Sequence, residues 1–296
     1  FNIIASRRFP MKFIKGLIKF ILGLLIIVIL LGGGTYVFVR VKYGIDPINT
    51  INQLSQLNEK VDEKKLAPDP FDENDLTGAM TSLNNSVPNL VSYDEQNGYS
   101  FNYSIDKRFV ATYQITDKEL GALADTLLKT QAKDGIKIGD TLVPISLIDF
   151  SFSPNIISGE TITTFSVLVK ISLDPFIAKM SSFPLNMLKN KVPENLYVNS
   201  IFDVTKTDDS FGYNVNHNTL KLNYLTSADS EDFINTLNAL LSIGTAESLN
   251  LTIGSKIMDL LIGTKFNPGL IYNLSYLGAS TYEFSYTNNQ NLLTVK

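Results

Sequence analysis

Histidine occurs once in this 296-residue chain, as His217, and cysteine is absent. One imidazole without thiolates does not make the usual tetrahedral zinc sites, and it is the single imidazole from which a serine–histidine–acid triad could be built. His217 stands in the polar run of residues 214–218 (NVNHN), a composition typical of turns. We therefore expect a surface turn residue there, and predict no catalytic residue, metal site or cofactor.

Two further patterns suggest chemistry. Ser104 and Lys107 have the spacing of the Ser-x-x-Lys motif of penicillin-interactive enzymes, but neither a Ser-Asp-Asn nor a Lys-Thr-Gly partner motif is present, so we interpret the match as chance. Asp69, Asp72, Glu73 and Asp75 lack the alternating spacing and central glycine of a calcium-binding loop. A solvated linker is expected there instead.

Residues 20–39 form an uncharged stretch long enough, at 1.5 Å per helical residue, to cross the roughly 30 Å hydrocarbon core of a bilayer. Five basic residues precede this stretch and two follow it, so the positive-inside rule places the N-terminus in the cytoplasm. We predict a cytoplasmic segment (1–19), a single transmembrane helix (20–39) in the cell membrane, and an extracytoplasmic remainder. A cleaved signal peptide, with the glycines of residues 32–34 imitating a cleavage site, is the alternative.

Charge is divided unevenly along the chain. Residues 1–42 hold seven basic side chains and no acid, which leaves 18 basic against 29 acidic side chains, a net charge of −11, on residues 43–296. A surface of that sign repels nucleic acid and other polyanions at long range. Arg108 is the sole arginine beyond residue 42, so guanidinium clamps for phosphate have one candidate. Nucleic acid is therefore not an expected partner.

Helical spacing of apolar residues predicts a helix that begins at Asp46-Pro47 and a second, short helix around residues 75–83. Residues 62–75, with two prolines and many charges, read as a linker. We predict a membrane-proximal helical linker over residues 40–94. Further helices are expected after the capping box of Thr116 and Glu119 and over residues 227–241 and 249–261.

In other segments the apolar residues alternate with a period of two. Such runs cover residues 99–105, 109–115, 165–173, 196–204, 220–224, 270–276 and 282–286. An apolar face opposite a polar face of Ser, Thr, Asn and Lys is typical of an antiparallel sheet with one solvated side. We predict an α+β fold, with the N-terminal transmembrane helix followed by a curved, mostly antiparallel sheet that has helices packed on one face, in an extracytoplasmic domain of residues 95–296.

An ordered set of segments resembles a known family. Residues 115–120 (ITDKEL) open a helix, a strand pair runs through Leu173, and residues 183–188 (FPLNML) and 192–198 (VPENLYV) follow. With the N-terminal anchor, this set resembles the YpmS-like family of membrane-anchored extracytoplasmic proteins of Gram-positive bacteria, over the anchor and about residues 110–206. The resemblance implies an elongated sheet outside the membrane, of a build suspected of holding lipid, and it carries over no catalytic residue.

Tyrosines are concentrated on the apolar side of the predicted strands, where a purely apolar core would favour Phe or Leu. The residues concerned are Tyr99, Tyr103, Tyr113, Tyr272, Tyr276, Tyr282 and Tyr286. One interpretation is an ordinary core whose hydroxyls reach its rim. The other is a partly open groove whose amphipathic wall accepts an apolar chain or a helix of a partner.

These features predict a single-pass, membrane-anchored, non-enzymatic protein that binds an apolar ligand, such as lipid, or an envelope protein partner. Two alternatives belong to other classes. One is a membrane-tethered hydrolase of cell-wall glycan, which needs two carboxylates about 5 to 9.5 Å apart, a separation that a sequence does not reveal. The other is a structural component of an envelope assembly.

Overall fold

The computed structural model describes most of the chain beyond residue 45. The described residues are 26, 46–95, 98–102, 106, 108–131, 136–138, 141–157, 159–179, 190, 192–241 and 244–296. Apart from residue 26, the predicted transmembrane helix lies outside them, as do Ser104 and Lys107. Within these ranges no helix has both the length and the apolar character needed to cross a bilayer.

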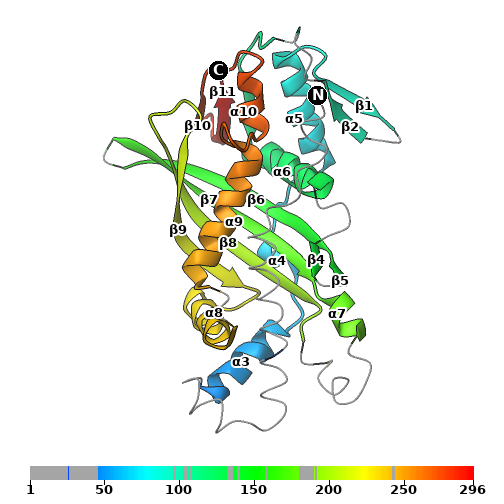
Figure 1. Ribbon diagram of the computed structural model, residues 1–296, viewed down its shortest axis with the longest axis vertical. Coiled ribbons are helices and arrows are strands. Elements are labelled where there is room, and N and C mark those ends of the chain that lie inside the picture. Colours follow the sequence, from blue (N-terminus) through cyan, green and yellow to red (C-terminus); the bar gives the residue numbers. More distant parts are fainter. Residues whose placement is uncertain are drawn as a thin grey trace.

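A four-stranded antiparallel sheet forms the centre of the molecule (Figure 1). Its strands lie in the order β6 (Ile145–Ile157), β7 (Glu160–Ser172), β8 (Asn195–Lys206) and β9 (Tyr213–Leu222). Alternate residues of β7, among them Phe165, Val167 and Ile171, are buried on one face, as the period of two predicts. The strands predicted over residues 165–173 and 196–204 are confirmed.

The remaining described strands form smaller sheets. A three-stranded sheet has the order β10 (Tyr282–Thr287), β11 (Gln290–Val295) and β3 (Tyr113–Thr116). Two hairpins pair β1 (Val91–Asp94) with β2 (Gly98–Phe101) and β4 (Ile136–Ile138) with β5 (Thr141–Val143). Every ladder in the described ranges is antiparallel, which confirms the α+β prediction, although the strands divide among four sheets rather than one.

Helices pack on the central sheet and at its two ends. On the sheet lie α6 (Asp117–Gln131), against β6, and α9 (Ala246–Leu261), against β8 and β9. Figure 1 shows α3 (Pro47–Leu57), α7 (Asp174–Lys179) and α8 (Ser227–Leu241) toward one end, and α5 (Glu73–Ser86) and α10 (Leu270–Ser275) at the other. The predicted helix over residues 227–241 matches α8 at both ends.

Two helix starts follow the predicted local chemistry. Asp46 caps α3, where its carboxylate accepts a hydrogen bond from Ile48 N at 3.0 Å. At the start of α6, Thr116 N donates to Glu119 Oε2 at 2.7 Å and Glu119 N donates to Thr116 Oγ1 at 3.3 Å. This reciprocal pair is the capping box expected from the sequence.

The segment of residues 270–276 is a helix, α10, and not the predicted strand. The buried apolar residues are Leu270, Ile271 and Leu274 of this helix and Leu277 just beyond its end, a spacing that places them on one helical face. The strand prediction counted the alternating Leu and Tyr residues and left out Ile271 and Leu277. A short apolar run can fit both the strand period of two and the helical period of 3.6. Here packing against the main core favours the helix.

Phenylalanine rings form the centre of the main core. Phe165 lies at ring-centroid distances of 5.3 to 5.8 Å from four others, which are Phe150, Phe152, Phe202 and Phe284. Since Phe284 belongs to β10, the cluster joins the small sheet to the central one. Met80 and Leu83 of α5 pack in the same core, so residues from the segment predicted as a linker (40–94) are part of the compact domain.

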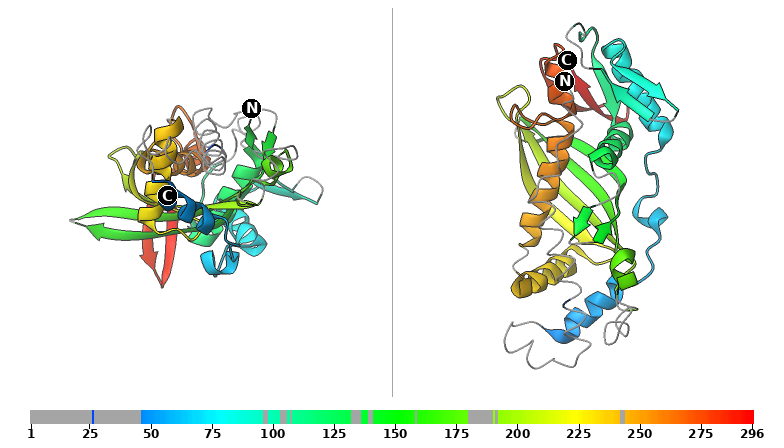
Figure 2. Two further views of the ribbon diagram at one scale, coloured as in Figure 1. Left: turned by 90° about the horizontal axis from the view of Figure 1, so that it is seen from below. Right: turned by 45° about the vertical axis from the view of Figure 1, so that its right-hand side comes forward.

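The segment between α3 and α5 runs along the opposite face of the central sheet (Figure 2). It contains the short helix α4 (Glu63–Leu66) and the buried Ala67. Glu63 Oε1 accepts hydrogen bonds from Lys170 Nζ and Tyr197 Oη, both at 2.6 Å. Helices therefore lie on both faces of the sheet, and the prediction that they occupy one face holds only for the larger ones.

The acids of this segment have local partners. Asp69 pairs with Lys118 of α6 at 2.5 Å. Asp72 caps α5, and the side chain of Asp75 accepts from Asp72 N at 2.8 Å to complete a capping box. These contacts fix the segment to α6 and start α5.

A bulge in β9 determines where the one histidine lies. Ile201 pairs with Thr219 and Phe202 pairs with His217, so Asn218 is an extra residue in β9. The shift brings His217 to the same face as Phe202, toward α9. The prediction of a surface turn residue is therefore wrong, because the polar run of residues 214–218 is strand.

Asn250 of α9 supplies the hydrogen bonds that this bulge requires. The side chain is fully buried, and its Nδ2 lies 2.6 Å from Ile201 O and 2.7 Å from His217 Nδ1. Ser200 Oγ donates to Asn250 Oδ1. A bulge disrupts the ladder and leaves backbone groups to be satisfied by other donors, and a buried carbonyl without one is costly. The amide thus fixes the register of α9 on the sheet.

One turn further along α9, Gly254 allows the helix to approach the sheet closely. A Cβ atom at this position would lie 2.8 Å from Phe202 Cγ and 2.9 Å from Val215 Cγ1.

We predict that Gly254→Ala lowers the free energy of unfolding by about 1–3 kcal/mol because the core must shift to admit the methyl group. Urea unfolding measures this change. Thr252→Ala on the same helix is the control, with a change within about 0.5 kcal/mol, and equal effects of the two variants would contradict the close approach.

The Glu63 contacts also predict a pH dependence. Hydrogen bonds from Lys170 and Tyr197 hold the pKa of Glu63 below its usual range, so this stabilisation is present above the pKa of the unfolded chain and is lost as the pH falls through the folded pKa. We predict that Glu63→Gln, at this partly exposed site, costs about 0.5–1 kcal/mol at pH 7 and that the cost shrinks toward pH 3. Unfolding of both proteins at the two pH values tests this, and a cost independent of pH would contradict it.

Candidate functional site

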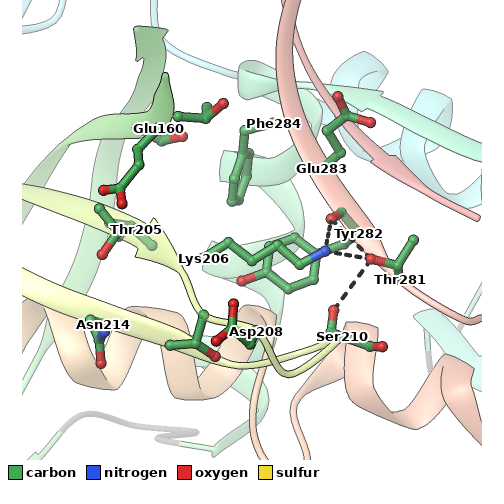
Figure 3. A pocket seen from close by; sticks show the side chains of 14 residues that line it. Glu160, Thr205, Lys206, Asp208, Ser210, Asn214, Thr281, Tyr282, Glu283 and Phe284 are labelled. Carbon is green, nitrogen blue, oxygen red and sulfur yellow. Dashed lines mark hydrogen bonds between the residues drawn. The ribbon is translucent and has the colours of Figure 1, made fainter. Parts of the chain in front are cut away.

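A cleft lies between the small sheet and the far ends of β7 and β8, and we call it the β10 cleft (Figure 3). It has a volume of about 760 Å³. Its walls come from the start of β7, the end of β8, the following turn of residues 207–212, and the first half of β10. Threonine, serine and asparagine side chains predominate, with Tyr282 and Phe284 from β10. Most of this wall can form hydrogen bonds.

Lys206 lies at the centre of the β10 cleft. Its Nζ donates to Thr281 Oγ1 and to Tyr282 O, the latter at 2.9 Å, and it lies 5.1 Å from the centroid of the Tyr282 ring (Figure 3). Burial lowers the pKa of Lys206, the Glu283 carboxylate acts against this shift, and Lys296 adds to it. No carboxylate of the described residues pairs with Lys206, and Glu283 pairs with Lys296 at 3.1 Å.

The backbone of β10 presents an open edge to this cleft. Thr281 and Lys296 exchange two hydrogen bonds, with N···O distances of 3.2 and 3.0 Å. Because hydrogen-bonded and non-hydrogen-bonded positions alternate in an antiparallel ladder, every second residue from Thr281 bonds to β11. The N–H and C=O groups of Tyr282, Phe284 and Tyr286 therefore point away from β11. The bond from Lys206 to Tyr282 O confirms this direction at the first of the three.

The charges around the β10 cleft are mainly negative. Glu160, Asp208 and Glu283 line it together with the single cation Lys206. In Figure 3 Glu160 lies on the β7 side and Glu283 on the β10 side. The cleft thus combines an unpaired strand edge with an acidic, hydroxyl-rich wall, which suits an extended polypeptide more than a small anion.

A second hollow lies between α5 and the β1–β2 hairpin, and we call it the α5 groove. Its volume is about 830 Å³. Met80, Thr81 and Asn84 of α5 line one side, and Tyr93 and Tyr99 of the hairpin line the other. The two tyrosine rings lie 4.9 Å apart between centroids.

The tyrosines predicted to share one groove lie in several places. Tyr113 and Tyr282 are almost fully buried, although Tyr282 also borders the β10 cleft. Tyr99 lines the α5 groove, Tyr286 is exposed on β10, and Tyr103 lies outside the described residues.

Tyr272 lies on α10 and Tyr276 is the C-cap residue of that helix; their ring centroids are 5.7 Å apart. The structure therefore brings Tyr99 and Tyr282 to two different hollows and does not join the described tyrosines into one wall.

Lys206 and Tyr93 are the site residues that sequence reasoning missed. A lysine at the end of an amphipathic strand has the pattern of a solvated residue, and its position beside β10 follows from the packing of two sheets. Tyr93 lies in a four-residue strand, too short for a clear period. No local signal in the sequence identifies either residue.

Ionisable groups of the described ranges also lie outside the two hollows. No set of three or more His, Asp or Glu side chains in these ranges is arranged to hold a metal ion. Burial raises the pKa of Asp149 in β6, and the nearby carboxylate of Asp117 adds to that shift. Asp149 lies at the bulge of β6, where it pairs with Leu168 of β7.

Comparison with known proteins found no matching family model, no matching curated protein and no matching solved structure. The resemblance to the YpmS-like family therefore stays a prediction.

The contacts of Lys206 predict that it fastens β10 to β8. We expect Lys206→Met to remove both hydrogen bonds, keep the packing over Tyr282, and lower the free energy of unfolding by about 1 kcal/mol. Amide hydrogen exchange should quicken in β10 more than in α8, which is remote from the cleft. A uniform increase over both elements, or no change in β10, would contradict this role.

Proposed function

We propose that this chain is a membrane-tethered, non-enzymatic binding protein whose β10 edge receives an extended segment of a protein partner as an added strand. The observation that carries the proposal is the open edge of β10 beside an accessible cleft. In this binding mode main-chain hydrogen bonds provide affinity, and the walls of the cleft select the side chains of the partner.

The geometry supports a strand more than a lipid chain. Phe284 presents a backbone donor and acceptor at the edge where β10 lines the cleft, and an apolar chain in the β10 cleft would leave these groups and the threonine hydroxyls unpaired. Each unsatisfied polar group that becomes buried costs about 1–3 kcal/mol. An added strand satisfies the backbone groups and leaves the hydroxyls in contact with polar side chains or water.

Charge selects the kind of partner. The β10 cleft carries three carboxylates against one ammonium group, and residues 43–296 together carry a net charge of −11. The field of such a surface accelerates association with a basic segment and opposes association with a second copy of this chain. We therefore expect an extended partner segment that contains lysine or arginine.

The position of the cleft fits the predicted anchor. Figure 1 shows α3, the first described helix, at the end of the molecule opposite β10 and β11. If residues 20–39 span the membrane, the short connection to α3 keeps that end near the bilayer. The β10 cleft would then face away from the membrane, toward the envelope.

Proline at residue 286 tests the proposal. Tyr286 is 62% exposed, and its N–H points to the open edge, so Tyr286→Pro removes an edge donor and leaves the bonds between β10 and β11 in place. We predict that the full chain in a zwitterionic detergent binds a fluorescein-labelled ten-residue peptide of alternating lysine and valine, and that Tyr286→Pro weakens this binding by about tenfold, measured by fluorescence anisotropy.

Tyr286→Thr is the matched control, because it removes the ring and keeps the N–H. We expect its affinity to stay within about threefold of the parent protein. A peptide of alternating glutamate and valine should bind more weakly than the lysine peptide. Equal affinity of the proline and threonine variants, preference for the glutamate peptide, or self-association of the chain would each overturn the proposal.

A further inference from the structure

The α5 groove has a lining that differs from that of the β10 cleft. Apart from Glu73, its lining residues are uncharged, and no lysine or arginine is among them. Besides the tyrosine hydroxyls, its uncharged hydrogen-bonding groups are the hydroxyls and amides of Thr77, Thr81, Asn84, Asn85 and Thr126. We infer that the α5 groove binds a neutral oligosaccharide, at a site separate from the strand edge of β10.

The aromatic residues provide the surface on which a sugar ring can stack. The Tyr93 side chain is 64% exposed, and its ring lies 4.9 Å from that of Tyr99 at an interplanar angle of 57°. Tyr99 Oη donates to Thr77 Oγ1 at 3.3 Å, which ties the hairpin to α5. The C–H faces of a pyranose pack on aromatic rings, while its hydroxyls remain free to bond sideways.

The polar residues of α5 are placed to meet those hydroxyls. Thr77, Thr81 and Asn85 follow one another at four-residue spacing, so they form a row along one face of the helix. The Thr77 hydroxyl already bonds to Glu73 O and Tyr99 Oη, so Thr81 and Asn85 are the members of this row that face a ligand. Asn84 Oδ1 accepts from Val91 N at 3.2 Å, which fixes the amide between helix and hairpin. Its nitrogen remains a donor for a ligand. A row of uncharged donors and acceptors beside an aromatic ring is the arrangement that an oligosaccharide requires.

Energetics distinguish this ligand from an acyl chain. A lipid tail in the α5 groove would remove water from Thr81, Asn84 and Asn85 without replacing its hydrogen bonds, at about 1–3 kcal/mol for each buried group. A saccharide replaces those bonds. The groove volume of about 830 Å³ lies in the usual range for ligand sites.

The charges around the α5 groove favour a neutral oligosaccharide over an anionic ligand. Phosphate and carboxylate groups need a cation or a set of backbone donors, and no cation lines this groove. The negative field of residues 43–296 opposes them further. The ligand is therefore a neutral sugar chain and not a teichoic-acid-like or uronic-acid polymer.

The test is calorimetric titration of the full chain, in a zwitterionic detergent, with four probes. The probes are the hexamer of N-acetylglucosamine, maltohexaose, polygalacturonate and palmitate. We expect saturable binding of at least one neutral hexasaccharide at concentrations below about 1 mM. We expect Tyr93→Ala to weaken it by about tenfold or more and Tyr93→Phe to keep it within about threefold, because the ring and not the hydroxyl supports the sugar.

Tyr276→Ala is the matched control, since Tyr276 is 63% exposed but lies at the C-cap of α10, outside the groove. Binding should be unchanged in this variant and also in Tyr286→Pro, which separates the inference from the proposed strand addition. No binding of either hexasaccharide, binding of palmitate or polygalacturonate in their place, or equal effects of Tyr93→Ala and Tyr276→Ala would overturn it.

Discussion

The proposed addition of a strand depends on the alternating direction of the backbone hydrogen bonds in β10. Residues 281, 283, 285 and 287 are directed to β11, so the backbone groups of the residues between them must find other partners. Lys206 supplies one such partner, to Tyr282 O. Lysine at a sheet edge commonly prevents unwanted pairing. Here Lys206 covers one end of the edge, while the outward backbone groups of Phe284, which lines the cleft, and of Tyr286, further along β10, remain available.

The position of that edge is a consequence of core packing. Phe284 anchors β10 to the central sheet through its contact with Phe165, at a centroid distance of 5.3 Å. On the same face, Asn250 and Gly254 of α9 fit the bulged strand β9, the first by hydrogen bonds and the second by leaving out a side chain. Phe284 thus holds β10 against the central sheet, and the β10 cleft lies between the small sheet and the ends of β7 and β8.

Local chemistry made part of the fold predictable from sequence. The capping box of Thr116 and Glu119, the Asp46 cap and the bounds of α8 follow from residues close together in the chain. The position of His217 was not predictable, because the bulge at Asn218 depends on a partner in α9. The apolar residues of 270–276 fit both a strand and a helix, and the burial of Ile271 and Leu277 favours the helix. The prediction of a tyrosine-lined groove required all the strands to share one face of a single sheet. The described strands instead belong to four sheets.

Addition of a strand to β10 should protect one set of its amides and leave the alternate set unchanged, and amide hydrogen exchange distinguishes the two sets. With the peptide of alternating lysine and valine bound, we expect slower exchange at the amides of Phe284 and Tyr286, which point to the open edge. The amides of Glu283 and Ser285, already bonded to β11, should change little. Slowed exchange confined to other elements, or no difference between the two sets of β10 amides at saturating peptide, would contradict it.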